Sequence, residues 1–206
     1  MIVLGITGGV GSGKSRVLYD LEKNYDAYIV EADKLAHKLM EPGRPIYREI
    51  IRQFGADIVT DEAPYLINRE KLGKIVFSDR EKLAMLDSIT HPLVKEEILR
   101  QIDEKKTSGD TRLFVIEAAL LIQDGYKDIC DEIWYIWVPQ EIRITRLMEQ
   151  RGYTRERCLS MFQSQESDEY YKRYADFTIN NQFEYKNSSK QLNARLNKLL
   201  HGDIIS

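Results

Sequence analysis

Short apolar runs alternate with longer segments of helical periodicity along the 206-residue chain. The runs are rich in β-branched and aromatic residues, which is typical of fully buried strands. They cover residues 2–6, 28–30, 113–118, 133–138 and 177–179. Buried strands separated by helices predict an α/β fold, namely a five-stranded parallel sheet with helices on both faces.

The segments between the strands predict helices. Helix is expected from about Ser15, from Pro139 to about Gln150, and in an amphipathic segment at the C-terminal end. Residues 34–106 are too long for one crossover helix, and we interpret them as a separate helical lobe in which His91-Pro92 begins a helix. A second helical excursion covers residues 140–174.

A glycine-rich segment carries the sharpest chemical signal. Residues 8–15 read GGVGSGKS and match G-x-x-x-x-G-K-[ST] between a predicted strand and a predicted helix. Glycines let successive backbone N–H groups point at a polyphosphate, and the helix N-terminus adds partial positive charge. Lys14 can reach the β- and γ-phosphates of a nucleotide, and the Ser15 hydroxyl can ligate Mg²⁺. The predicted ATP contacts are Gly8, Gly9, Gly11, Ser12, Gly13, Lys14, Ser15 and Arg16.

A phosphate-binding loop alone does not separate a kinase from a GTPase switch or a motor ATPase. The chain has no Asn-Lys-x-Asp guanine signature. Glu117 lies near the end of the third apolar run, where its carboxylate could serve a metal ion through water or simply make hydrogen bonds. Asp33 follows the second run and could orient or deprotonate an acceptor hydroxyl, hold Mg²⁺, or cap a helix that begins at Lys34.

The amino-acid composition limits the classes of partner that the chain is expected to bind. The chain has 30 Lys and Arg against 33 Asp and Glu, and a net charge of -3 argues against a general nucleic-acid-binding surface. Cys130 and Cys158 form no disulfide framework or metal-ligand pattern. There is no signal-peptide pattern and no apolar run of roughly 20 residues. We therefore expect a soluble, cytoplasmic monomer or small homo-oligomer that binds neither membrane nor nucleic acid.

Residues 4–181 resemble the dephospho-CoA kinase family. Only the glycine-rich loop is specific by itself, whereas the joint order and spacing of all the matching segments is highly specific. The segments are residues 5–15, 30–33, 41–43, 54–55, 69–72, 75–77, 90–94, 146–148, 165, 175–176 and 180–181.

The resemblance implies phosphorylation of the ribose 3′-hydroxyl of dephospho-CoA by ATP with Mg²⁺, which gives CoA and ADP in the last step of CoA biosynthesis. It implies a nucleotide-binding core (residues 1–33, 107–139 and 175–206), a CoA-binding lobe (34–106) and a lid (140–174). On this resemblance Asp33 is the general base, Lys14 and the lid residue Arg146 are catalytic, and the acceptor is bound by Thr7, Asp33, Arg69 and His91.

The chain departs from the family pattern at several positions. The segment 119–123 lacks the usual Pro and Glu, with Ala119 and Gln123 at its ends. Arg16 replaces a frequent Thr, and Gln150 stands where an arginine is usual, with Arg151 next to it.

Alternatives remain open at this point. They are another small-molecule kinase, a nucleotide switch or nucleic-acid-stimulated ATPase, and a kinase-like domain without turnover. Several side chains are given ordinary structural interpretations. Trp134 and Trp137 are expected in the hydrophobic core rather than stacked on the adenine base of a nucleotide. Arg143, Arg155 and Arg157 are expected on solvent-exposed helix faces.

Overall fold

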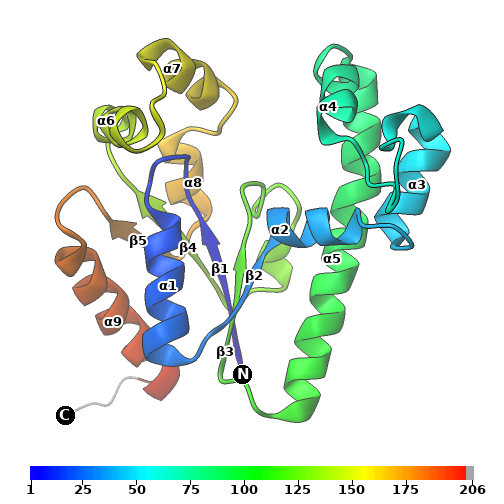
Figure 1. Ribbon diagram of the computed structural model, residues 1–206. Helices are drawn as coiled ribbons and strands as arrows, with labels where there is room; N and C mark the ends of the chain where they lie inside the picture. The colour runs from blue at the N-terminus through cyan, green and yellow to red at the C-terminus, as the bar shows by residue number, and fades with distance from the viewer. Residues whose placement is uncertain (203–206) are drawn as a thin grey trace. The chain divides into compact units, whose positions relative to one another are not determined.

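The structure is a computed structural model in which residues 1–202 are described (Figure 1). They form two compact units: Met1–Ile29 together with the chain from Gly109 onward, and Val30–Ser108. The first unit contains most of the sheet, and the second is helical. None of the described helices is both long and apolar enough to cross a bilayer.

A five-stranded sheet organises the first unit, and its strand order is β2-β3-β1-β4-β5. In chain order the strands are β1 (Ile2–Thr7), β2 (Tyr28–Glu31), β3 (Leu113–Glu117), β4 (Glu132–Trp137) and β5 (Phe177–Asn180). β1 pairs in parallel with both β3 and β4, and β4 pairs in parallel with β5. The predicted five-stranded parallel sheet is thus confirmed, with strand bounds within about two residues of the apolar runs.

Helices cover both faces of this sheet. α1 (Lys14–Tyr25) and α9 (Tyr185–His201) share one apolar core with the strands, in which Trp134 is fully buried (Figure 1). The next residue of β4, Tyr135, stacks on Tyr171 of α8 (Asp168–Tyr174), with 4.9 Å between ring centroids. Because neighbouring strand residues point to opposite faces, α8 packs on the face away from α1 and α9.

Two further helices of the first unit pack against the glycine-rich loop. α6 (Gln140–Arg151) and α7 (Arg155–Gln163) share a small core of Ile144, Leu147 and Cys158, against which Val10 of the loop packs. Thr154 caps α7 by accepting a hydrogen bond from the Arg157 backbone N–H at 3.2 Å. A short 3₁₀ helix, Tyr126–Asp128, precedes β4.

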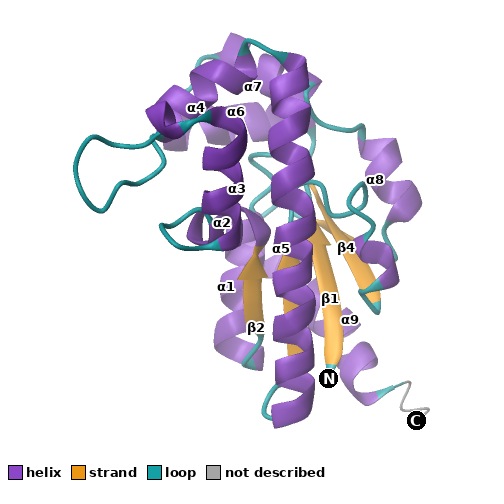
Figure 2. Ribbon diagram, turned by 90° about the vertical axis from the view of Figure 1, so that its right-hand side faces the viewer, coloured by secondary structure: helices purple, strands orange, loops and turns teal. Residues whose placement is uncertain are grey.

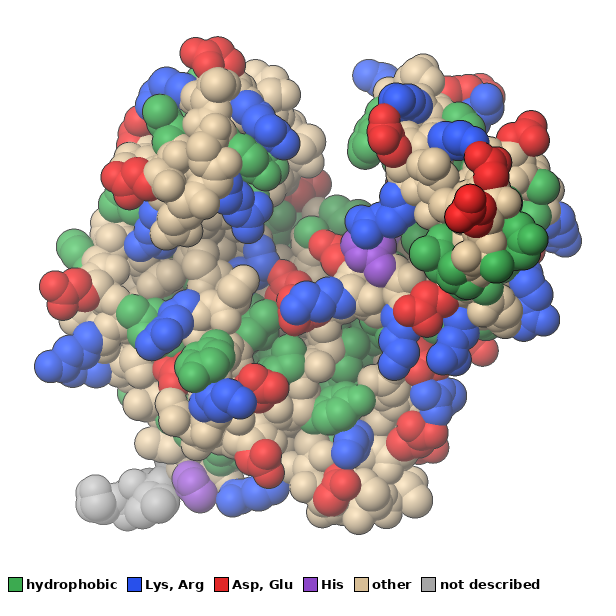
Figure 3. All heavy atoms as spheres, viewed as in Figure 1, with side chains coloured by type: hydrophobic (Ala, Val, Ile, Leu, Met, Phe, Trp, Pro, Cys, Tyr) green, Lys and Arg blue, Asp and Glu red, His purple; other side chains and the backbone are tan. Residues whose placement is uncertain are grey.

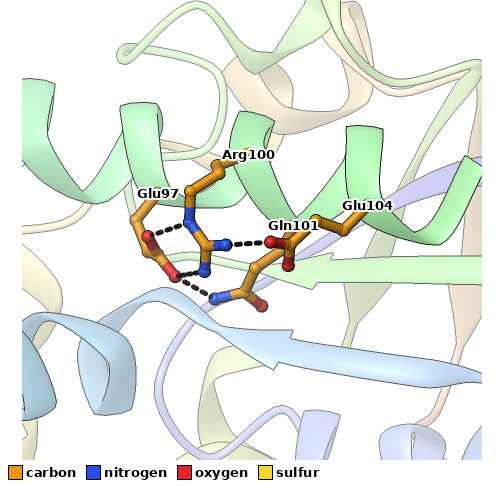
Figure 4. Close-up of polar contacts among 4 residues, drawn as sticks. All are labelled: Glu97, Arg100, Gln101 and Glu104. Carbon is orange, nitrogen blue, oxygen red and sulfur yellow. Dashed lines mark hydrogen bonds and ion pairs between the residues drawn. The ribbon is translucent and has the colours of Figure 1, made fainter. Parts of the chain in front are cut away.

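The second unit is built around one long helix (Figure 2). α5 (Arg80–Ser108) packs against α2 (Ala32–Leu39), α3 (Pro45–Phe54) and α4 (Arg69–Phe77), and a 3₁₀ helix spans Ala56–Ile58. An exposed polar network follows one face of α5, where Arg100 binds Glu97 and Glu104 while Gln101 also donates to Glu97 (Figure 4).

Two local predictions are wrong. No helix begins at His91-Pro92, because α5 continues through both residues. Pro92 is exposed, as is Ser88 one turn earlier, so water can bond the Ser88 carbonyl that proline leaves without its helical donor. Asp33 neither ends β2 nor caps a helix: β2 ends at Glu31, and α2 already begins at Ala32.

Candidate active site

The glycine-rich loop joins β1 to α1. Gly13 precedes the first residue of α1 and has a φ of 88°, a left-handed conformation that side-chain-bearing residues rarely adopt. A Cβ atom at Gly13 would lie 2.5 Å from Nδ2 of Asn181. Gly13 therefore satisfies two demands at once, a positive φ and a close approach of the end of β5.

The side chain of Lys14, the first residue of α1, reaches back across the glycine-rich loop. Its Nζ donates a hydrogen bond to the Gly8 carbonyl at 2.6 Å and lies 3.6 Å from Oε1 of Glu117 at the end of β3. Ser15, in the first turn of α1, is exposed. Glu117 is thus brought to the loop, and an ammonium group, a carboxylate and a hydroxyl occupy the same end of the sheet.

A cavity of about 460 Å³ opens beside the loop, a volume in the range of small-molecule sites. Its walls are the loop, the last turns of α6 and the chain that follows β5. Beyond the loop and the start of α1, the lining residues are Arg146, Leu147, Gln150, Arg151, Asn181, Phe183 and Tyr185. Gln150 and Arg151 both face the cavity, and on the surface Lys and Arg side chains are interspersed with Asp and Glu (Figure 3).

Asn181 ties three elements to the loop. It is buried, its Nδ2 donates to the Ser12 carbonyl at 2.8 Å, and its Oδ1 accepts from Ser188 of α9 at 2.7 Å. Arg146 of α6 donates to the Asn181 carbonyl at 2.8 Å. This network places the guanidinium of Arg146 beside the loop.

Arg16 lies at the edge of the same cavity. Its guanidinium stands over the ring of Tyr185, 4.9 Å from the centroid, and Tyr185 donates to Asp20 at 2.7 Å. The side chain is exposed on the first turn of α1. Arg16 is therefore held at the mouth of the cavity by an aromatic ring rather than by a carboxylate.

Two hydroxyls of the loop region are buried without a hydrogen-bond partner in the described chain. They are Oγ1 of Thr7, the last residue of β1, and Oγ of Ser12 within the loop. Buried polar atoms are normally paired, so such exceptions gather where a ligand completes the site. Thr7 and Ser12 were both predicted at the site from the sequence.

The prediction for Arg143 is wrong. This residue was expected on a solvated helix face, but it is only 8% exposed, and its guanidinium lies against Gly9 of the loop. Arg155 and Arg157 are exposed, as predicted. The sequence did not predict this burial because it results from the packing of α6 on the loop, a contact between residues far apart in the chain.

The second unit carries the remaining candidates. Asp33 is exposed in the first turn of α2, and Arg69 is exposed at the start of α4. Partial burial and the charge of Arg69 lower the pKa of His37, one turn after Asp33, while Asp33 opposes this effect. Asp33 and Arg69 therefore both lie within electrostatic reach of His37. The i,i+4 spacing from Asp33 could have pointed to His37.

His91 lies within α5, partly exposed, with Nε2 at 3.7 Å from Oδ1 of Asp87 one turn earlier. A separate cavity of about 690 Å³ lies between α3 and α5 of this unit. Its lining includes Arg48, Glu49, Met85, Pro92 and Leu93. Because α5 runs from Arg80 to Ser108, His91 lies in the middle of a helix rather than at a helix N-terminus.

A parallel sheet whose first strand runs into a glycine-rich loop, a lysine and a helix N-terminus defines a P-loop nucleotide-binding protein. The fold comparison agrees with this class. The shikimate kinase from Acinetobacter baumannii superposes with a TM-score of 0.52 at 11% identity, covering 100% of this chain and 96% of that chain, a similarity that concerns the fold alone.

Sequence comparison is more specific. The sequence model of dephospho-CoA kinase matches residues 2–187. The dephospho-CoA kinase of Carboxydothermus hydrogenoformans is 38% identical over 95% of this chain and 93% of its own length. That of Bacillus licheniformis is 33% identical over 95% of each chain. The chain therefore belongs to the dephospho-CoA kinase family, as the sequence resemblance predicted.

Solved structures agree with the family. A protein from Thermus thermophilus superposes with a TM-score of 0.77 at 28% identity, covering 96% of this chain and 97% of that one. The dephospho-CoA kinase from Campylobacter jejuni superposes with a TM-score of 0.71 at 25% identity, covering 98% of each.

Proposed function

We propose that this protein transfers the γ-phosphoryl group of ATP to the ribose 3′-hydroxyl of dephospho-CoA, giving CoA and ADP as the last step of CoA biosynthesis. The observation that carries the proposal is the family match over residues 2–187, which includes a loop with Lys14 held across it. A kinase of unknown acceptor would share the loop but not the match along the helical second unit.

The loop and its neighbours act on the phosphates. Backbone N–H groups at the start of α1 and the ammonium group of Lys14 stabilise negative charge on the transferring phosphoryl group. Arg146 supplies a second cation from α6, because its hydrogen bond to Asn181 holds it beside the loop. Preorganised charges of this kind lower the barrier without reorganising during the reaction.

The oxygen donors near Lys14 suit Mg²⁺. This ion is usually held by one or two protein oxygen ligands together with substrate phosphates. Ser15 and Glu117 would hold it here, because both lie at the end of the sheet where Lys14 crosses the loop. When bound, the ion neutralises charge on the β- and γ-phosphates.

Asp33 is proposed as the general base that accepts the proton of the 3′-hydroxyl, and Thr7, Arg69 and His91 as contacts of the acceptor. Asp33 is exposed in the first turn of α2, where its carboxylate is accessible to a bound acceptor. The second unit would hold the acceptor, and residues 140–174 would close over the phosphates as a lid. We further propose that the enzyme acts in the cytoplasm as a monomer or small homo-oligomer, without nucleic acid.

The test is an acceptor panel. ADP release from ATP is measured with dephospho-CoA and, as controls, with adenosine, uridine and shikimate. We expect rapid turnover only when dephospho-CoA is the acceptor. NMR of the product should show the new phosphate on the 3′-oxygen. Faster turnover with any control acceptor would refute the proposal and favour another small-molecule kinase.

A further inference from the structure

Arg143 is a buried cation behind the phosphate-binding loop. It projects from α6, its side chain is 8% exposed, and it is absent from the walls of the neighbouring cavity. A Cβ atom on Gly9 would collide with Nη1 of Arg143 and lie 3.1 Å from its Cζ. The guanidinium therefore packs against the backbone of the loop, in space that exists because residue 9 is glycine.

The guanidinium of Arg143 makes few polar contacts within the described part of the chain. No carboxylate of the described chain pairs with it, and its Nε is buried without a hydrogen-bond partner. The only hydrogen bond of its side chain within the described residues is a long one, 3.5 Å from Nη1 to the neutral Oε1 of Gln165. The ring of Phe162 lies under the guanidinium at 4.3 Å from its Cζ. Burying a cation costs free energy unless an anion pairs with it.

Gln165 links Arg143 to the loop backbone. The Oε1 atom that faces Arg143 also accepts a hydrogen bond from the Val10 N–H at 3.3 Å. Arg143 also contacts the loop through its own backbone and Cβ, which lie 3.2 and 3.3 Å from a Cβ built on Gly11. The side chain thus touches Gly9 directly and is linked to Val10 through Gln165, and it does not line the cavity.

We propose that Arg143 is a positioning residue for ATP: it holds the Gly9–Val10 turn and supplies a buried positive charge that the polyphosphate neutralises across the loop. Arg143 acts through the loop and its field rather than by touching the reacting atoms. The inference rests on the proposed function only in taking ATP as the phosphoryl donor. It explains why an arginine is buried here without a carboxylate, since the missing anion arrives with the nucleotide.

The test compares Arg143→Gln with Arg143→Lys. For Arg143→Gln we expect the KM for ATP to rise about tenfold while kcat falls by less than about threefold, because binding rather than chemistry is weakened. The melting temperature without nucleotide should stay equal or rise, because an uncompensated buried charge has been removed. The stabilisation by saturating ATP should shrink. Arg143→Lys, which keeps the charge, should recover most of the KM.

The remaining outcomes also decide for or against the proposal. If the KM of Arg143→Gln stays within about twofold of wild type, whatever its melting temperature, Arg143 has a packing role only. If Arg143→Gln loses both stability and affinity or fails to fold, Arg143→Lys decides. A lysine variant with unrecovered KM overturns the proposal, and a recovered KM supports it. Arg173→Gln, which removes an exposed arginine of α8, is the charge-matched control and should leave the KM unchanged.

Failure of this inference can be told from failure of the proposed function. ATP binding is also measured by titration without an acceptor, with Lys14→Ala as the reference for a damaged phosphate site. Weak binding by both Lys14→Ala and Arg143→Gln supports the role of Arg143 even if dephospho-CoA is not the acceptor. Weak binding by Lys14→Ala alone refutes the role of Arg143 and leaves the kinase assignment intact.

Discussion

The phosphate-binding loop and the helical second unit differ in how they hold their candidate residues. In the loop, contiguous residues are held by an internal hydrogen bond, from Lys14 to the Gly8 carbonyl, and by two bonds to distant residues. Asn181 donates to the Ser12 carbonyl, and Gln165 accepts from the Val10 N–H. In the second unit Asp33 and Arg69 are exposed and come from different helices. The difference suggests that phosphate binding is built into the backbone, whereas acceptor recognition depends on individual side chains.

The largest expected effect belongs to the loop. Lys14→Ala should lower kcat/KM by about 10³-fold or more, because it removes a preorganised charge from the transferring phosphoryl group. Steady-state kinetics with ATP and dephospho-CoA measure this loss. Lys23→Ala removes an exposed lysine from the last turn of the same helix and should behave as wild type. Unchanged kinetics for Lys14→Ala would refute the interpretation of residues 8–15 as a phosphate-binding loop.

The second unit should respond differently to its own key substitution. Asp33→Asn keeps the shape of the side chain but cannot accept a proton, so kcat should fall by about 10²-fold or more while ATP affinity is retained. Single-turnover kinetics and ATP titration separate the two quantities. Asp61→Asn, at an exposed loop position of the same unit, is the matched control. Turnover by Asp33→Asn within about threefold of wild type would show that Asp33 is not the base.

Substitution of one glycine in each region tests how closely the surrounding residues are packed. Gly13 and Gly43 have similar positive φ values, 88° and 82°, but a Cβ atom would meet Asn181 at Gly13 and nothing within 4 Å at Gly43. Gly43→Ala should cost about 1 kcal/mol of stability from backbone strain alone. Gly13→Ala should cost about 2–3 kcal/mol, because it also displaces the buried Asn181 amide from its partners. Urea unfolding measures both, and equal losses would refute the close packing at Gly13.

The smallest effect concerns the surface of α5. A hydrogen bond from Arg100 lowers the pKa of Glu97 from 4.5 to about 2. A lowered pKa in the folded state means that the pair stabilises the protein fully above pH 4.5 and that this contribution is lost as the pH falls toward 2. Glu97→Gln should therefore shift the urea midpoint slightly at pH 7 and hardly at all near pH 2. The loss should be well below that of Gly13→Ala, because the pair is solvated. An equal shift at both pH values would contradict this explanation.

The sequence predicted the sheet and the loop because both depend on local patterns. Continuous apolar runs such as residues 113–118 identify buried strands, and GGVGSGKS combines backbone freedom with a cation in one short segment. The prediction that a helix begins at His91-Pro92 was wrong because it relied on proline, a local signal, and tertiary packing outweighs that signal here. Buried residues on both sides of Pro92, including Ile89 and Val94, keep α5 continuous.

By itself, then, the sequence determined the α/β class, the phosphate-binding loop and the family, since each is written in residues that are neighbours along the chain or in their order. Only the tertiary structure decided which cations surround the loop. Arg146 could be anticipated from the family pattern, but its bond to Asn181 joins residues 35 positions apart. The charge of Arg143 predicts a solvated position on its helix, but the side chain is buried because the glycine at residue 9 leaves room for its guanidinium. Long-range packing creates that environment, and no local pattern of polar and apolar residues encodes it.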